Sequence, residues 1–160
     1  MPNWCNNTIE IKGDKESIDE FKKFLDESDG KDWFNFFLPT PVELKEEGWY
    51  DWNVQNWGCK WNCDAQDWEL NEDGTSISFW FDSPWAPPIV LYEMISDSYN
   101  VDAHYLEEGM EFVGRFREGY DEFYEYSDVD SLEEIPEEIL DQWNLRESLM
   151  DREEYEDEDE

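Results

Sequence analysis

The alternation of apolar and polar residues along the chain predicts a regular series of strands and helices. Residues 8–13 alternate and stop at a glycine, which is typical of a strand. Apolar residues at helical spacing follow within residues 14–30. Alternating runs at 65–70 and 75–82 flank an Asp-Gly pair, which favours a hairpin. A second helical pattern, opened by two prolines, then leads to a strand over residues 101–106.

The order βαββαβ predicts an α+β, ferredoxin-like fold, with an antiparallel sheet and two helices on one face. This domain is expected to span residues 1–127, with a Trp-rich insertion at 31–63 and an added hairpin at 110–127. Residues 128–150 have the spacing of an acidic amphipathic helix. Residues 151–160 are nearly all acidic, so we expect a disordered tail.

The strand of residues 75–82 predicts which tryptophan is exposed. Ile77, Phe79 and Phe81 point to one side of a strand, so Trp80 points to the other. The chain has ten tryptophans, and by the usual preference most of the cluster over residues 49–85 belongs to the core. Two or three are expected to be exposed, with Trp80 as the best candidate.

The net charge of the chain indicates which class of partner it can bind. The formal net charge is -34, and the segment 128–160 carries -14 of it, so the body of the chain is also strongly acidic. No Lys or Arg occurs between Lys60 and Arg115. Such a surface repels nucleic-acid phosphates and anionic lipid, and it favours basic partners. The aromatic content is 18%, which indicates a folded chain because acidic disordered chains are poor in aromatics.

The acidic surface has two interpretations. It serves solvation or adaptation to high salt, or it imitates the phosphate row of a nucleic acid. Outward residues on a β-strand and i,i+4 carboxylates on a helix recur about 6–7 Å apart. Phosphates recur about every 3.4 Å along one strand of DNA, so carboxylates from two neighbouring protein elements together approximate that repeat. The predicted partner-binding residues are the carboxylates Glu107, Glu108, Glu111, Glu134, Glu137, Glu138 and Asp141, with Trp80 and Trp143 as aromatic anchors.

Metal sites and catalytic motifs receive little support from the sequence. Cys5, Cys59, Cys63 and His104 could supply a Cys3His zinc site by number alone, but buried free thiols are favoured. Residues 128–133 offer carboxylates for a divalent cation without the frame of an EF-hand. No nucleophile elbow, phosphate loop or metalloprotease motif occurs. We therefore expect a protein that is not an enzyme, with no cofactor and no dedicated metal.

Compartment signals point to the cytoplasm. The three cysteines are sparse and odd in number, as in reduced cytosolic proteins. No run of about 20 apolar residues suggests a membrane span. The opening residues lack the charged and apolar regions of a signal peptide.

Several blocks of sequence resemble the YubB-type ferredoxin-like domain family of phage and plasmid proteins. They are MPNWCNN at 1–7 with the strand to Gly13, FLPTPVEL at 37–44, WGCKW at 57–61, SPWAPP at 83–88 and EGMEFVG at 108–114. The blocks cover residues 1–115. The resemblance implies a ferredoxin-like fold and a mobile-element origin, and it carries no established activity. The acidic helix and tail lie outside it.

We expect a non-catalytic phage or mobile-element protein that acts in the host cytoplasm. It would bind and inhibit a basic, nucleic-acid-binding host protein by occupying the cationic groove of that protein. The alternative is an accessory interaction module, homodimeric through the sheet or the Trp143 helix, whose acidity serves solubility. A cation-dependent enzyme would need a specific divalent site.

Overall fold

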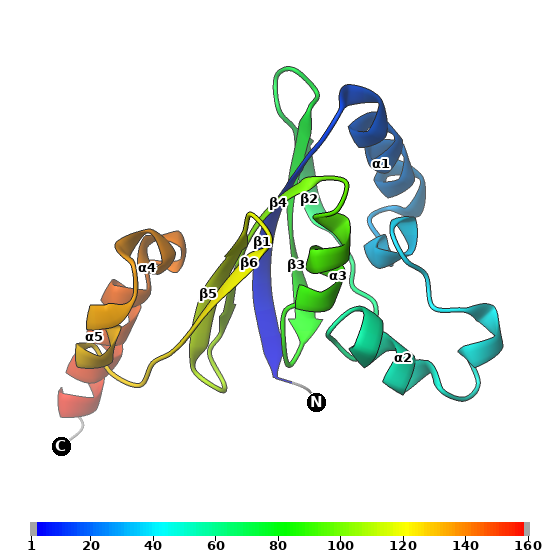
Figure 1. Cartoon of the computed structure of the whole chain (residues 1–160). Coiled ribbons are helices and arrows are strands. Elements are labelled where there is room, and N and C mark those ends of the chain that lie inside the picture. The colour runs from blue at the N-terminus through cyan, green and yellow to red at the C-terminus, as the bar shows by residue number, and fades with distance from the viewer. Residues whose placement is uncertain (1–2, 159–160) are drawn as a thin grey trace.

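The computed structural model describes residues 3–158 and contains one six-stranded antiparallel sheet (Figure 1). The strands are β1 (Trp4–Lys12), β2 (Gln66–Leu70), β3 (Ser76–Pro84), β4 (Asn100–Glu107), β5 (Phe112–Arg117) and β6 (Tyr120–Glu125). The helices are α1 (Lys15–Ser28), α2 (Trp49–Asn56), α3 (Ile89–Ile95), α4 (Glu137–Trp143) and α5 (Leu145–Glu158). Short 3-10 turns are η1 (Trp33–Phe36), η2 (Val42–Leu44) and η3 (Asp130–Glu134).

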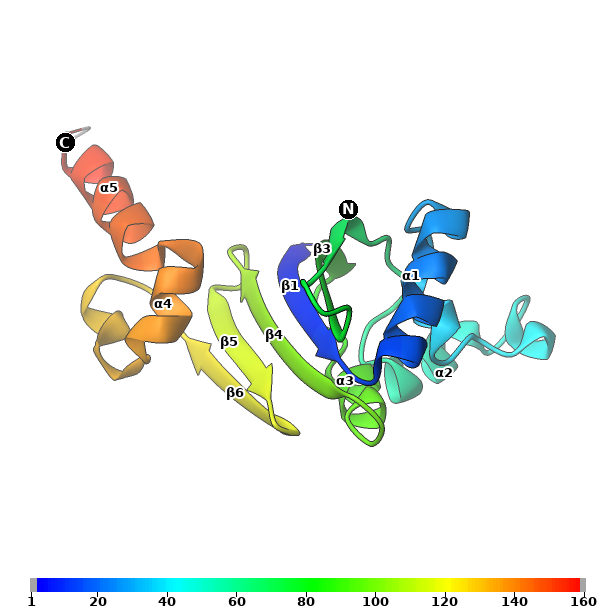
Figure 2. The same ribbon diagram turned by 90° about the horizontal axis from the view of Figure 1, so that it is seen from above.

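The strand order is β2-β3-β1-β4-β5-β6. Its first four strands, with α1 and α3, form the predicted ferredoxin-like βαββαβ unit, so the α+β expectation is confirmed. Strands β5 and β6 extend the sheet beyond β4 as the added hairpin. Helices α1, α2 and α3 lie on one side of the sheet, and α4 and α5 lie on the other (Figures 1 and 2).

The main core lies between the sheet and α1 and α3. Strand β1 alternates, and its buried residues are Cys5, Asn7, Ile9 and Ile11, the face that the pattern predicts. The Trp-rich insertion contributes to this core through Trp33, which is fully buried against Phe79 and Phe81 of β3. Burial of such large aromatic side chains is a major apolar contribution that opposes the charge repulsion of an acidic body.

A second core forms on the opposite face of the sheet. Leu106 of β4 and Val113 of β5 pair across the strands and pack beneath α4 and α5. The helices supply the buried side chains Ile139, Leu140, Leu145 and Leu149. The sheet is therefore covered by a hydrophobic core on each face at its β4–β5 side.

The acidic C-terminal segment differs from the single helix that its spacing predicts. It holds a 3-10 turn and two helices, because Pro136 separates η3 from α4 and Asn144 adopts a left-handed conformation with φ 52° between α4 and α5. The break turns the chain so that Leu140 and Leu149 both reach the second core. Helix α5 continues to Glu158, where a disordered tail was expected. Residues 159–160 of that tail lie outside the described residues.

None of the helices within residues 3–158 combines the length and apolar character that crossing a membrane requires.

Candidate partner-binding face of the sheet

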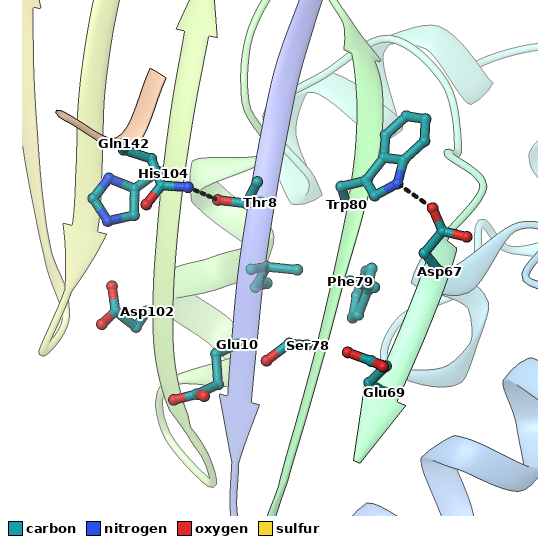
Figure 3. Close-up of a pocket in the computed structure, with 11 residues that line it drawn as sticks. Thr8, Glu10, Asp67, Glu69, Ser78, Phe79, Trp80, Asp102, His104 and Gln142 are labelled. Carbon is teal, nitrogen blue, oxygen red and sulfur yellow. Dashed lines mark hydrogen bonds between the residues drawn. The ribbon is translucent and has the colours of Figure 1, made fainter. Parts of the chain in front are cut away.

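A shallow hollow of about 420 Å³ lies on the sheet face opposite α1 and α3 (Figure 3). Strands β1, β2, β3 and β4 form its floor, and Gln142 of α4 forms one border. Helices α4 and α5 cover only the β4–β5 part of this face, so the outward side chains of β1 and β3 are left uncovered beside them. This hollow is the candidate functional site.

The sheet register places the hollow's side chains in two rows. Thr8 of β1 lies opposite Trp80 of β3 and His104 of β4. Two residues along β1, Glu10 lies opposite Ser78 and Asp102. Residues opposite each other on one face lie close enough to interact. One row is therefore aromatic and polar, and the other is acidic.

Trp80 stands at the rim of the hollow beside β2. Its side chain is 43% exposed, which confirms the orientation predicted from the alternation of β3. The indole Nε1–H donates to Asp67 Oδ2 at 2.8 Å (Figure 3). This bond orients the ring while leaving its apolar surface open, as in aromatic residues that anchor protein interfaces.

Arg115 of β5 connects the sheet to α4. Its Nε and Nη2 donate to the two carboxylate oxygens of Asp102 at 3.0 and 2.8 Å. Its Nη1 lies 3.0 Å from Glu138 Oε2 on α4. The hydrogen bonds to Asp102 raise the pKa of the guanidinium further above its ordinary value. Arg115 therefore neutralises Asp102, and α4 is held against the sheet at the edge of the hollow.

His104 lies half-buried between Arg115 and Thr8 across the strands. Desolvation lowers the pKa of the imidazole, and the neighbouring Arg115 cation lowers it further. Its buried Nδ1 has no hydrogen-bond partner within residues 3–158. Gln142 closes this side by donating from Nε2 to Thr8 Oγ1 at 3.4 Å (Figure 3). Because its pKa lies below the ordinary value of about 6.5, the imidazole is neutral near pH 7.

The predicted acidic stripe lies on the same side of the sheet as Trp80. Glu134, at the end of η3, and Glu137, Glu138 and Asp141 of α4 are all exposed. Two of these carboxylates are already paired, since Glu137 accepts from Arg146 of α5 and Glu138 contacts Arg115. Glu134 and Asp141 have no ion pair within residues 3–158. They are the stripe residues best placed to meet an external cation.

The predicted cluster at the end of β4 does not form one surface. Glu107 is buried, and its two oxygens accept the backbone N–H groups of Gly109 and Met110 at 2.7 Å each. The placement of Glu107 in a partner interface is therefore wrong, because its carboxylate stabilises the β4–β5 turn. Glu108 is exposed, whereas Glu111 is half-buried with its carboxylate 3.7 Å from Arg152.

Trp143 also has a structural position that sequence alone did not predict. The side chain is half-buried, and it packs against the second core at the end of α4. Its indole Nε1 is buried without a hydrogen-bond partner within residues 3–158. Trp143 therefore supports the packing of α4 and does not project as a free aromatic anchor.

The cysteines and the histidine lie on different faces of the sheet. Cys5, Cys59 and Cys63 are buried in the main core, on the helix-covered side. His104 points to the opposite face, so the four residues cannot share a zinc ion. Burial raises the pKa of Cys63, which keeps the thiol protonated. Within residues 3–158, no three His, Cys, Asp or Glu side chains are arranged to hold a metal.

Of the residues that line the hollow, only Trp80 was predicted from the sequence as a partner-binding residue. Thr8 and Glu10 follow directly from the alternation of β1, which assigns them to the face opposite Ile9. Asp67 reaches the hollow only through the pairing of β2 with β3, and Gln142 only through the packing of α4 against the sheet. No local sequence signal identifies those two contacts.

A family described as "Ferredoxin-like domain in Api92-like protein" matches residues 57–153. The match includes α4 and most of α5, so the acidic helices belong to the shared domain, although the resemblance seen in the sequence ended at residue 115. No curated protein and no solved structure matches the chain.

Proposed function

The chain belongs to the family of ferredoxin-like domains in Api92-like proteins, and from its open sheet face we propose that it is a non-catalytic binder of a basic protein. The observation that carries the proposal is the position of exposed Trp80 in a hollow shared with carboxylates of β1 and β2 and bordered by acidic α4. An aromatic centre with an acidic surround complements Lys and Arg side chains.

The partner we propose is a host protein whose cationic groove normally holds DNA or RNA. The net charge of -34 would steer such a partner over long range, and Glu134 and Asp141 would occupy phosphate positions. The sequence blocks that resemble YubB-type proteins support an origin in a phage or plasmid. An inhibitor of a host nucleic-acid-binding protein, acting in the host cytoplasm, fits that origin.

Capture from a bacterial lysate tests this function. Tagged protein is expected to retain a nucleic-acid-binding protein in low salt and to release it in high salt or on addition of duplex DNA, because the contacts are ionic. The double variant E134K/D141K is expected to lose that protein. The matched variant E20K/E27K changes the same charge on exposed positions of α1, across the sheet, and should retain it.

Retention that is indifferent to salt and DNA, or equal loss in both variants, would contradict the proposal. Retention that is indifferent to salt and DNA would favour an accessory, homodimeric module, and one observation supports that alternative. Phe123 and Tyr120 of the edge strand β6 are 50% and 68% exposed. An edge strand with exposed aromatics can pair with a second copy. Light scattering would then detect a dimer.

A further inference from the structure

A second hollow, of about 260 Å³, adjoins the first one and shares Trp80 with it. Its aromatic walls are Trp4 of β1, Trp61 of the insertion and Trp80 of β3, and its acidic residues are Asp64 and Asp82. Segments far apart in the sequence therefore bring three indoles and two carboxylates to one place. Exposed tryptophans near carboxylates are a combination that suits a cation.

The three indoles are fixed by contacts of their own. Trp4 and Trp61 pack edge to face, with ring centroids 5.9 Å apart and an interplanar angle of 66°. The Trp80 ring is held by its hydrogen bond to Asp67. Trp4 and Trp80 nevertheless remain 44% and 43% exposed. The walls are thus ordered before any ligand enters, which lowers the entropy cost of binding.

Asp82 lies two residues beyond Trp80 on the same face of β3. Its carboxylate has no hydrogen-bond or ion-pair partner within residues 3–158, whereas Asp64 accepts the backbone N–H of Asp32 at 3.1 Å. Partial burial beside the aromatic walls raises the pKa of Asp82. Asp82 is nevertheless an exposed residue, so its carboxylate is accessible to an incoming cation.

Trp61 already takes part in one contact of this kind. The Nζ of Lys60 lies 5.4 Å from the centroid of the Trp61 ring and 5.4 Å from that of Tyr50. Lys60 is not among the residues that line the hollow. Lys60 therefore contacts the Trp61 ring without lining the hollow, and the hollow remains available to an external cation.

We propose that this hollow binds one arginine side chain of the protein partner, with the guanidinium between the indoles and against the Asp82 carboxylate. Arginine is favoured over lysine because its planar group stacks on aromatic rings while it donates in a fork to a carboxylate. The assignment rests on the proposed function, since it specifies how a basic partner would be anchored. It adds a specific contact to the salt-dependent attraction of the acidic stripe.

The test uses Nα-acetyl-arginine amide as the probe and the neutral citrulline analogue as its control. Indole N–H resonances of the ten tryptophans are followed by NMR and assigned with W4F, W61F and W80F. The arginine probe is expected to shift the resonances of Trp4, Trp61 and Trp80 selectively. D82N should weaken its binding about tenfold, the effect of losing a hydrogen bond between charged groups. E27Q removes one charge from an exposed position of α1, across the sheet, and should change the affinity less than about twofold, because distant exposed charges are screened.

Equal shifts with the citrulline analogue, or the same affinity in D82N as in the unmodified protein, would overturn the arginine site. The lysate capture is independent of this result. If capture is salt-sensitive but the arginine probe shifts none of the three indole resonances, the arginine site alone is overturned. Probe binding that depends on Asp82, without any salt-sensitive capture, would support the site and count against the proposed function.

Discussion

The guanidinium of Arg115 spans from the sheet to α4, where its Nη1 lies 3.0 Å from Glu138 Oε2. The same group holds Asp102 with two hydrogen bonds. The acidic helix therefore has an ionic attachment to the sheet in addition to the apolar contacts of the second core. This attachment fixes where the exposed carboxylates of α4 lie relative to Trp80.

Replacing Arg115 with methionine should lower the free energy of unfolding by about 1–3 kcal/mol, because Asp102 would lose its charged donors. Urea unfolding measures this change. R117M is the matched control, since Arg117 lies on the same strand and is exposed. Its effect should stay within about 0.5 kcal/mol, as for ordinary surface positions. Equal stability of R115M and R117M would show that the attachment contributes nothing.

Asn144 should be required at the junction of α4 and α5 because its φ is 52°. Alanine in a left-handed conformation is strained, and N144A also removes the hydrogen bond from Asn144 Nδ2 to Glu147 Oε2 at 2.9 Å. We expect N144A to cost about 1–2 kcal/mol of unfolding free energy. N144G should cost less than N144A, since glycine adopts this conformation readily. Thermal unfolding of the pair is the measurement, and the reverse order would contradict the explanation.

The chain contains one histidine, so an NMR titration of its imidazole reports His104 without ambiguity. The folded-state pKa should lie below the ordinary value of about 6.5, because the group is desolvated and faces Arg115. The unfolded chain then binds a proton that the folded chain does not. The His104 contribution therefore lowers stability as pH falls through about 6.5 towards the folded-state pKa. In H104Q this part of the pH dependence should disappear, and a folded-state pKa above about 6.5 would contradict the described environment.

The fold was largely predictable because its signals are local. Alternation identified the buried face of β1 and the exposed position of Trp80, and turn residues marked the hairpins. The spacing of Ile139 and Trp143 suggested one helix, but the direction of the chain at Asn144 depends on packing against Leu106. Such tertiary requirements override a periodic pattern.

The candidate site was predictable only in part. Its charge and one anchor, Trp80, follow from the sequence. Glu107 was misassigned because its sequence context does not show that two backbone N–H groups would enclose its carboxylate. The juxtaposition of Trp4 with Trp61 depends on how the insertion folds back onto β1, a contact between distant segments that no spacing rule gives.

The most direct test measures the affinity of the captured, purified partner for W80A and for Y50A. Both variants remove an exposed aromatic ring, 43% and 49% exposed respectively, and Tyr50 lies on α2, outside both hollows. We expect W80A to weaken binding about tenfold or more, as for an aromatic residue at the centre of an interface, and Y50A to leave it unchanged. Unimpaired binding by W80A, with circular dichroism confirming that it is folded, would contradict the claim that this sheet face binds the partner.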